Sequence, residues 1–125
     1  MRLASKIADI ENASALITGE NIGQVASQTL SNLRVADDAS KYPILRPLAG
    51  ANKDDIVTRA RKIGTYEISI EPYQDCCSYF VPVHPETRAN LDEMLELESK
   101  INIEAELELA FEQKELKTYK FNPEG

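Results

Sequence analysis

The stretch Thr18–Thr29, TGENIGQVASQT, determines how we interpret the fold. An apolar run at 15–17 precedes it, Gly19 and Gly23 lie within it, and helix-compatible residues follow. This order predicts a strand, a glycine turn and a helix N-terminus. Such an arrangement binds anionic ligands, because glycine lets a ligand approach the backbone and the first N–H groups of a helix attract negative charge. Ordinary strand-to-helix connections have the same spacing, so on spacing alone both interpretations stay open.

The segments around this stretch predict a small layer of parallel strands and helices. Hydrophobic spacing and capping residues predict a helix at 2–11, a strand at 15–18, a helix at 24–35, a strand or extended segment at 42–48, and a helix from Asn52 or Asp54 to Ile63 that ends at Gly64. Strands that alternate with helices in this way are typical of a parallel sheet. The predicted fold class is therefore α/β, with a parallel sheet and flanking helices.

The second half of the chain has a different character. Residues 65–85 mix β-branched, aromatic and proline residues, and we expect a mostly ordered loop. After Thr87 the sequence predicts acidic helices, and residues 118–121 are suited to an edge strand. We expect one domain over 1–125, with an α/β part at 1–85 and an acidic helical tail at 86–125.

Charge and composition narrow the class of protein. The net charge of −7 is uneven: residues 1–63 hold 9 Lys and Arg against 7 Asp and Glu, whereas residues 64–125 hold 5 against 14. An acidic surface binds nucleic acid poorly, because phosphate contacts need Lys and Arg. The sequence has no apolar run of membrane-spanning length and no apolar stretch typical of a signal peptide, and its two cysteines are adjacent. We therefore expect a cytoplasmic protein without a disulfide framework and without a membrane partner.

Several motifs resemble one known family. TGENIGQVASQTLSNL, ILRPLAG, KIGTYEISIEPYQDCC and FVP follow one another between Ala15 and Pro85, and in this order they resemble the ThiI-type tRNA sulfurtransferases, or tRNA 4-thiouridine synthetases. The resemblance implies the C-terminal half of an adenine-nucleotide α-hydrolase (PP-loop) domain, which is Rossmann-like. The family's SGG-x-DS phosphate-binding loop, its THUMP domain and its ferredoxin-like module have no counterpart in this sequence. The chain is therefore expected to be inactive alone.

The resemblance also implies a reaction and its participants. Such enzymes use ATP, with Mg²⁺, to adenylate a tRNA uridine. A cysteine persulfide then delivers sulfur and AMP leaves, and related enzymes supply sulfur for the thiazole of thiamine. The implied partners are ATP or AMP, tRNA bound mainly through modules outside this chain, a cysteine desulfurase as sulfur donor, and either an N-terminal half or a second copy of the chain.

The nucleotide candidates are Gly19, Gln28 and Gly23. The resemblance assigns nucleotide contacts to Gly19 and Gln28. Physically, a glycine at a strand end lets the backbone meet a purine or ribose, and a glutamine amide both donates and accepts hydrogen bonds. The alternative for Gln28 is a solvent-facing position on a helix.

Cys76 and Cys77 are the catalytic candidates. A thiolate is the nucleophile that sulfur transfer needs, and the resemblance places a persulfide-handling cysteine in the DCC loop, aligned better with Cys77 than with Cys76. Asp75 would raise rather than lower a thiol pKa, so activating groups must come from elsewhere. The alternative is a buried apolar cysteine pair.

Two further side chains need an interpretation. Arg46 follows the second predicted strand, where α/β proteins bind ligands, and either contacts phosphate or RNA or pairs with an acidic neighbour. His84 is the only histidine, and together with two adjacent cysteines it does not make up a zinc ligand set. We therefore predict no metal bound by this chain.

Two other functions stay open. The chain could be a non-catalytic nucleotide-binding or dimerisation module derived from this domain. It could also belong to another branch of the ATP-pyrophosphatase superfamily, although an adenylating ligase has no need of a thiol in the DCC loop.

Overall fold

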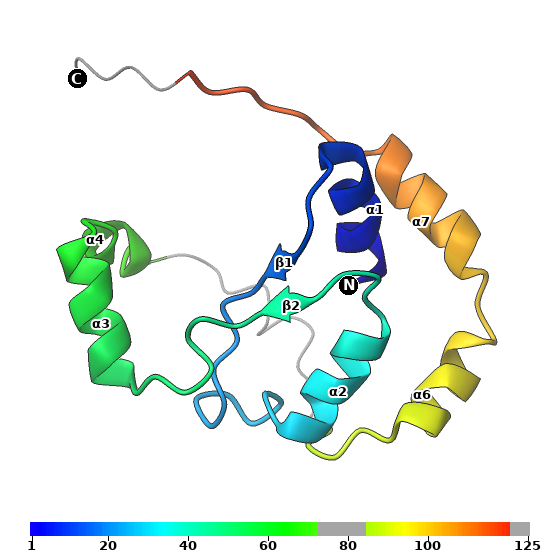
Figure 1. Ribbon diagram of the computed structural model, residues 1–125, viewed down its shortest axis with the longest axis horizontal. Helices are drawn as coiled ribbons and strands as arrows, with labels where there is room; N and C mark the ends of the chain where they lie inside the picture. Colours follow the sequence, from blue (N-terminus) through cyan, green and yellow to red (C-terminus); the bar gives the residue numbers. More distant parts are fainter. Residues whose placement is uncertain (73–84, 121–125) are drawn as a thin grey trace.

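The computed structural model describes residues 1–72 and 85–120. Two short strands lie between helices on either side of them (Figure 1). The elements in chain order are α1 (Arg2–Glu11), β1 (Leu16–Ile17), α2 (Leu30–Asp38), β2 (Ile44–Leu45), α3 (Lys53–Lys62), α4 (Tyr66–Ser69), α6 (Leu91–Glu98) and α7 (Ile103–Glu112).

The two strands pair in parallel, as the sequence predicted. Leu16 lies opposite Ile44 and Ile17 opposite Leu45. The pairing extends to both sides, because Leu16 N–H donates to the Pro43 carbonyl at 2.9 Å and Thr18 N–H donates to the Leu45 carbonyl at 3.0 Å. The parallel α/β fold class is therefore confirmed, and the carboxyl ends of both strands lead to the loops at 18–28 and 46–52.

Helix α1 packs against β1 and is hydrogen-bonded to the segment that leads into β2. Ser5 and Ala8 are its buried residues, and the Ser5 hydroxyl accepts a hydrogen bond from Lys41 N–H at 3.0 Å. The helix ends at Asn12, whose φ of 53° is left-handed and lets the chain turn toward β1. Helix α7 lies beside α1 (Figure 1).

Helix α3 has the boundaries that its capping residues predicted. The Asn52 side chain accepts a hydrogen bond from Asp55 N–H at 2.8 Å and so caps the N-terminus. Acidic residues in the first turn and basic residues in the last turn complement the helix dipole. Gly64 follows the helix with a φ of 76°. The short helix α4 packs against α3.

Two sequence-based predictions were wrong, for the start of a helix and for a terminal strand. The predicted helix at 24–35 begins only at Leu30, capped by Thr29, and continues to Asp38. Residues before Thr29 instead form a loop, because Ile22 N–H donates to the Ala49 carbonyl and Gly23 has a φ of 88°. The segment expected as a mostly ordered loop, 65–85, begins with the short helix α4, and its residues 73–84 lie outside the described residues. Residues 118–120 form no strand in the described part of the expected 118–121 segment.

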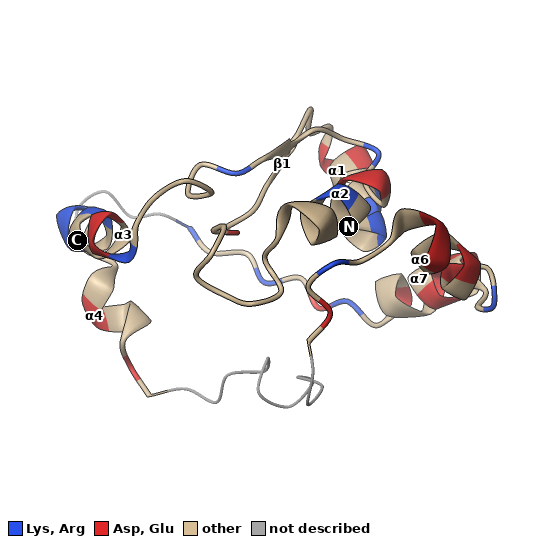
Figure 2. Cartoon of the chain, turned by 90° about the horizontal axis from the view of Figure 1, so that it is seen from below, with Lys and Arg blue, Asp and Glu red and all other residues tan. Residues whose placement is uncertain are grey.

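The C-terminal helices are acidic, as expected. Asn90 and Asn102 cap α6 and α7, and each helix has two acidic residues in its first turn. Figure 2 shows Asp and Glu gathered on this pair, on the opposite side of the molecule from α3. Within residues 1–72 and 85–120, no helix combines the length and apolar composition that crossing a bilayer requires.

The interior of the described molecule is small. Ala8 and Leu33 are its buried hydrophobic residues, whereas Ile17 is 72% exposed and Leu45 is 53% exposed. Ile17 and Leu45 are register partners and so lie on one face of the sheet. Parallel sheets are normally covered on both faces, so this face is unusually open.

Candidate functional site

The loop at the carboxyl end of β1 is held by a network of charged side chains. The Glu20 carboxylate accepts hydrogen bonds from the Thr18 hydroxyl and from Arg46 Nε, each at 2.7 Å. A second nitrogen of Arg46, Nη2, donates to Asp37 at 2.7 Å. Arg46 therefore joins the TGE segment to α2, and its own side chain is only 12% exposed.

This network also shifts the pKa of the Arg46 guanidinium. Partial burial lowers the pKa of Arg46, but the hydrogen bonds to Asp37 and Glu20 outweigh that effect and leave the pKa above its ordinary value. Of the two interpretations that the sequence left open, the structure shows the pairing with acidic neighbours. A contact between Arg46 and phosphate or RNA stays a prediction.

Asn21 anchors the same loop from inside. It is 5% exposed, and its Nδ2 donates to the carbonyls of Leu48 (2.5 Å) and Ala51 (2.6 Å) in the loop after β2. Sequence reasoning missed this residue and Glu20. Their only sequence signal was membership of the TGEN motif, because their partners lie 26 to 30 residues away.

Gln28 belongs to the loop rather than to a helix. Its Oε1 accepts a hydrogen bond from Asn21 N–H at 2.8 Å, and its own N–H donates to the Val25 carbonyl at 2.9 Å. The side chain therefore turns back across the loop that contains Gly19 and Gly23. The structure brings these three predicted nucleotide candidates into one loop at the carboxyl end of β1, next to Arg46.

The two glycines differ in the reason for their presence. Gly23 has a left-handed φ of 88°, which side chains rarely adopt. Gly19 has an ordinary φ and open space around the position of a Cβ atom. The backbone of Gly23 therefore requires glycine, whereas nothing within the described residues requires it at Gly19.

The N-terminus of α2 is already in contact with protein. The Thr29 hydroxyl donates to the Thr87 carbonyl at 2.8 Å and caps Asn32 N–H. Asn32 donates to the Glu86 carbonyl at 2.7 Å and accepts from Ala89 N–H at 3.0 Å. The strand, the glycine turn and the helix N-terminus thus follow one another in the predicted order, but six residues separate Gly23 from Leu30 and the helix start contacts residues 86–89. Anion binding at this helix start stays a prediction.

The cysteine candidates cannot be placed in the same way. Cys76, Cys77 and His84 lie outside the described residues. Within the described ranges, no three His, Cys, Asp or Glu side chains lie close enough together to hold a metal ion. The Mg²⁺ that the family resemblance implies together with ATP stays a prediction, and no chemical step is assigned to that ion.

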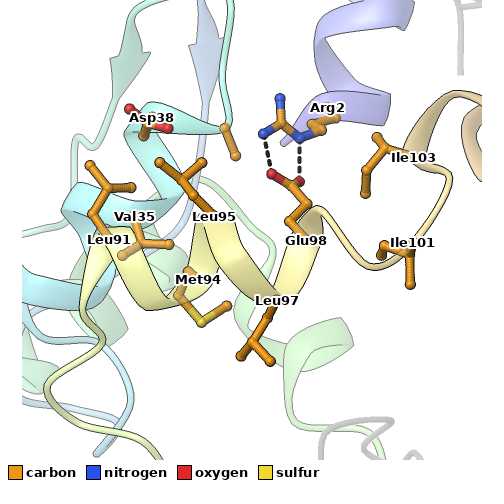
Figure 3. Close-up of a pocket in the computed structure, with 11 residues that line it drawn as sticks. Arg2, Val35, Asp38, Leu91, Met94, Leu95, Leu97, Glu98, Ile101 and Ile103 are labelled. Carbon is orange, nitrogen blue, oxygen red and sulfur yellow. Dashed lines mark hydrogen bonds and ion pairs between the residues drawn. The ribbon is translucent and has the colours of Figure 1, made fainter.

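A separate hollow lies between α1, α2 and α6. It has a volume of about 360 Å³ and a mainly apolar lining. Leu91, Leu95 and Val35 line one side, and the Arg2–Glu98 ion pair lies at another side (Figure 3). None of the described nucleotide candidates contributes to its lining, so we treat it as distinct from the loop at 18–28.

Comparison with known proteins places this geometry in a family. The family described as thiamine biosynthesis protein (ThiI) matches residues 1–103. The chain belongs to the ThiI family. A "Probable tRNA sulfurtransferase" of Caldanaerobacter subterraneus subsp. tengcongensis is 52% identical over 102 residues, which cover 82% of this chain and 27% of that protein. The Thermus thermophilus protein of the same description is 48% identical over 119 residues, covering 95% of this chain and 29% of that relative.

A solved structure from this family has the same fold. A crystal structure of a 4-thiouridine synthetase–RNA complex with bound ATP matches with a TM-score of 0.82 and 48% identity. The match covers 90% of this ThiI chain and 29% of that one. The chain thus spans less than a third of the length of the ThiI relatives it matches.

Proposed function

We propose that this chain is part of an ATP-dependent tRNA sulfurtransferase that makes 4-thiouridine. The observation that carries the proposal is the match, over 90% of the chain, to a 4-thiouridine synthetase solved with RNA and ATP. The loop at 18–28 supports it, because that loop gathers Gly19, Gly23 and Gln28 at the carboxyl end of β1, where open α/β sheets bind ligands.

The chemistry divides between two parts of the chain. The loop at 18–28 holds the adenine nucleotide. The uridine C4 oxygen attacks the α-phosphate and pyrophosphate leaves. The outer persulfide sulfur then attacks C4 and AMP departs, which leaves this sulfur joined to both the uridine and the cysteine. A second thiol attacks the cysteine sulfur, so that the S–S bond breaks, a new disulfide forms and 4-thiouridine is released. Cys77, with Cys76 as the alternative, carries or relays this sulfur, which a cysteine desulfurase supplies. Sulfur supply toward the thiamine thiazole is a further role of the same persulfide.

The exposed face of the sheet indicates that this chain works in contact with further protein. Ile17 and Leu45 expose an apolar surface on paired parallel strands. A two-stranded sheet with one uncovered face is marginally stable by itself. We infer that the remainder of the adenylating domain covers this face in the active protein and brings most of the tRNA contacts, which fits the acidic charge of α6 and α7.

A chimera tests this function directly. The segment of the Thermus thermophilus relative that matches this chain is replaced by residues 1–125, and the chimera is assayed for 4-thiouridine in tRNA by nucleoside analysis. We expect 4-thiouridine to form, and we expect Cys77→Ser to abolish it while Cys76→Ser retains it. A folded chimera that binds ATP and forms no 4-thiouridine would contradict the proposal and favour the non-catalytic nucleotide-binding module.

A further inference from the structure

The orientation of the Gln28 amide follows from its partner. Asn21 N–H lies 2.8 Å from Gln28 Oε1. A backbone N–H only donates, so the atom that faces it must be the oxygen, and the amide cannot be flipped without losing this bond. One lone pair of the oxygen is thus engaged within the loop, and the NH₂ group occupies the other branch of the amide.

Asn21 is itself held in place from a different part of the fold. Its Nδ2 donates both of its hydrogens to backbone carbonyls, those of Leu48 and Ala51, and the side chain is 5% exposed. Because a carboxylate has no donor, aspartate cannot replace this anchor. The anchor fixes the backbone of residue 21, and that backbone N–H in turn fixes Gln28.

We propose that Asn21 is a positioning residue that holds the Gln28 amide as a hydrogen-bond donor to the bound nucleotide. The inference rests on the proposed function, since it assumes that the loop binds an adenine nucleotide. The ligand atom that Gln28 meets is an acceptor: a ring nitrogen, a ribose oxygen or a phosphate oxygen. Gln28 then selects nucleotides by the acceptor that they present.

Calorimetric binding of AMP and of analogues lacking one acceptor each tests this role. The ligands are AMP, AMP with single ring nitrogens replaced by carbon, deoxy-AMP, and adenosine, which lacks the phosphate. The proteins are the wild-type chain, Gln28→Ala, Gln28→Glu and Asn21→Ala. Gln24→Ala is the matched control, because Gln24 is an exposed glutamine of the same loop. Circular dichroism confirms that each variant is folded.

We expect one analogue to bind the wild-type chain about tenfold more weakly than AMP, the effect of one lost hydrogen bond. That difference should vanish in Gln28→Ala and Gln28→Glu, shrink in Asn21→Ala and persist in Gln24→Ala. A purely structural role would weaken all ligands by one common factor and leave the difference unchanged.

Two results would overturn the inference, and they are distinguishable. If the wild-type chain binds AMP but the difference persists undiminished in Gln28→Ala or Asn21→Ala, the positioning role is wrong while nucleotide binding stands. If the wild-type chain binds neither AMP nor ATP, nucleotide binding by this chain fails, and the inference fails with it.

Discussion

Arg46 shows how one side chain joins segments that are distant in the sequence. It bonds to Glu20 in the loop after β1 and to Asp37 near the end of α2. Removing it leaves the half-buried Glu20 carboxylate without its cation, so we expect Arg46→Ala to lower the free energy of unfolding by about 1–3 kcal/mol. Urea denaturation measures this loss. Arg34→Ala, at an exposed position of α2, should change stability by less than about 0.5 kcal/mol. Equal losses in both variants would show that the Arg46 pairs contribute nothing.

Alanine substitutions at Gly23 and Gly19 are expected to affect different properties: stability for Gly23 and AMP affinity for Gly19. Gly23→Ala forces a side chain into a left-handed conformation (φ 88°) and should cost about 1–2 kcal/mol of stability. Gly19→Ala meets open space at an ordinary φ, so its thermal midpoint should stay unchanged while AMP affinity falls, because a methyl group then stands where the nucleotide approaches. Thermal unfolding and calorimetry on both variants check this. Unchanged AMP affinity in Gly19→Ala would remove Gly19 from the site.

At the scale of elements, α2 is fastened to the segment that leads into α6. Asn32 donates to the carbonyls of Ser27 and Glu86 and accepts from Ala89 N–H. Asn32→Ala removes all three bonds, and we expect a loss of about 1–3 kcal/mol and faster amide exchange at 85–90. Ser31→Ala, an exposed neighbour on the same helix, is the control. If amide exchange at 85–90 is the same in both variants, Asn32 does not hold this segment.

At the scale of the whole molecule, the Arg2–Glu98 pair joins the first helix to α6 across 96 positions of sequence. Both guanidinium bonds go to one carboxylate, and this bidentate contact lowers the pKa of Glu98 from its ordinary 4.5. A carboxylate with a lowered pKa in the folded state stabilises that state above its unfolded pKa. The contribution is lost as the pH falls through the folded pKa.

The corresponding experiment compares wild type with Glu98→Gln in urea at several pH values. We expect the stability difference to be constant above about pH 5 and to shrink as the pH falls below 4.5, the ordinary pKa of this carboxyl group. Glu96→Gln is the control, because Glu96 lies on the same helix and its ion pair with Lys100 is solvent-exposed. A difference that does not vary with pH would contradict the role of Glu98.

Features that depend on local interactions, such as helix boundaries and strand positions, could be predicted from the sequence. Helix α3 follows from the Asn52 cap and Gly64, and the parallel strands follow from apolar runs that alternate with helices, since capping and periodicity act between residues a few positions apart. Its motifs likewise indicated the ThiI family.

Tertiary structure decided three other features: the start of α2 at Leu30, the bonds of Arg46 to Glu20 and Asp37, and the orientation of Gln28. Each depends on groups that the fold brings together, such as the Ala49 carbonyl for Ile22 and the Leu48 carbonyl for Asn21, and no local pattern encodes such distances.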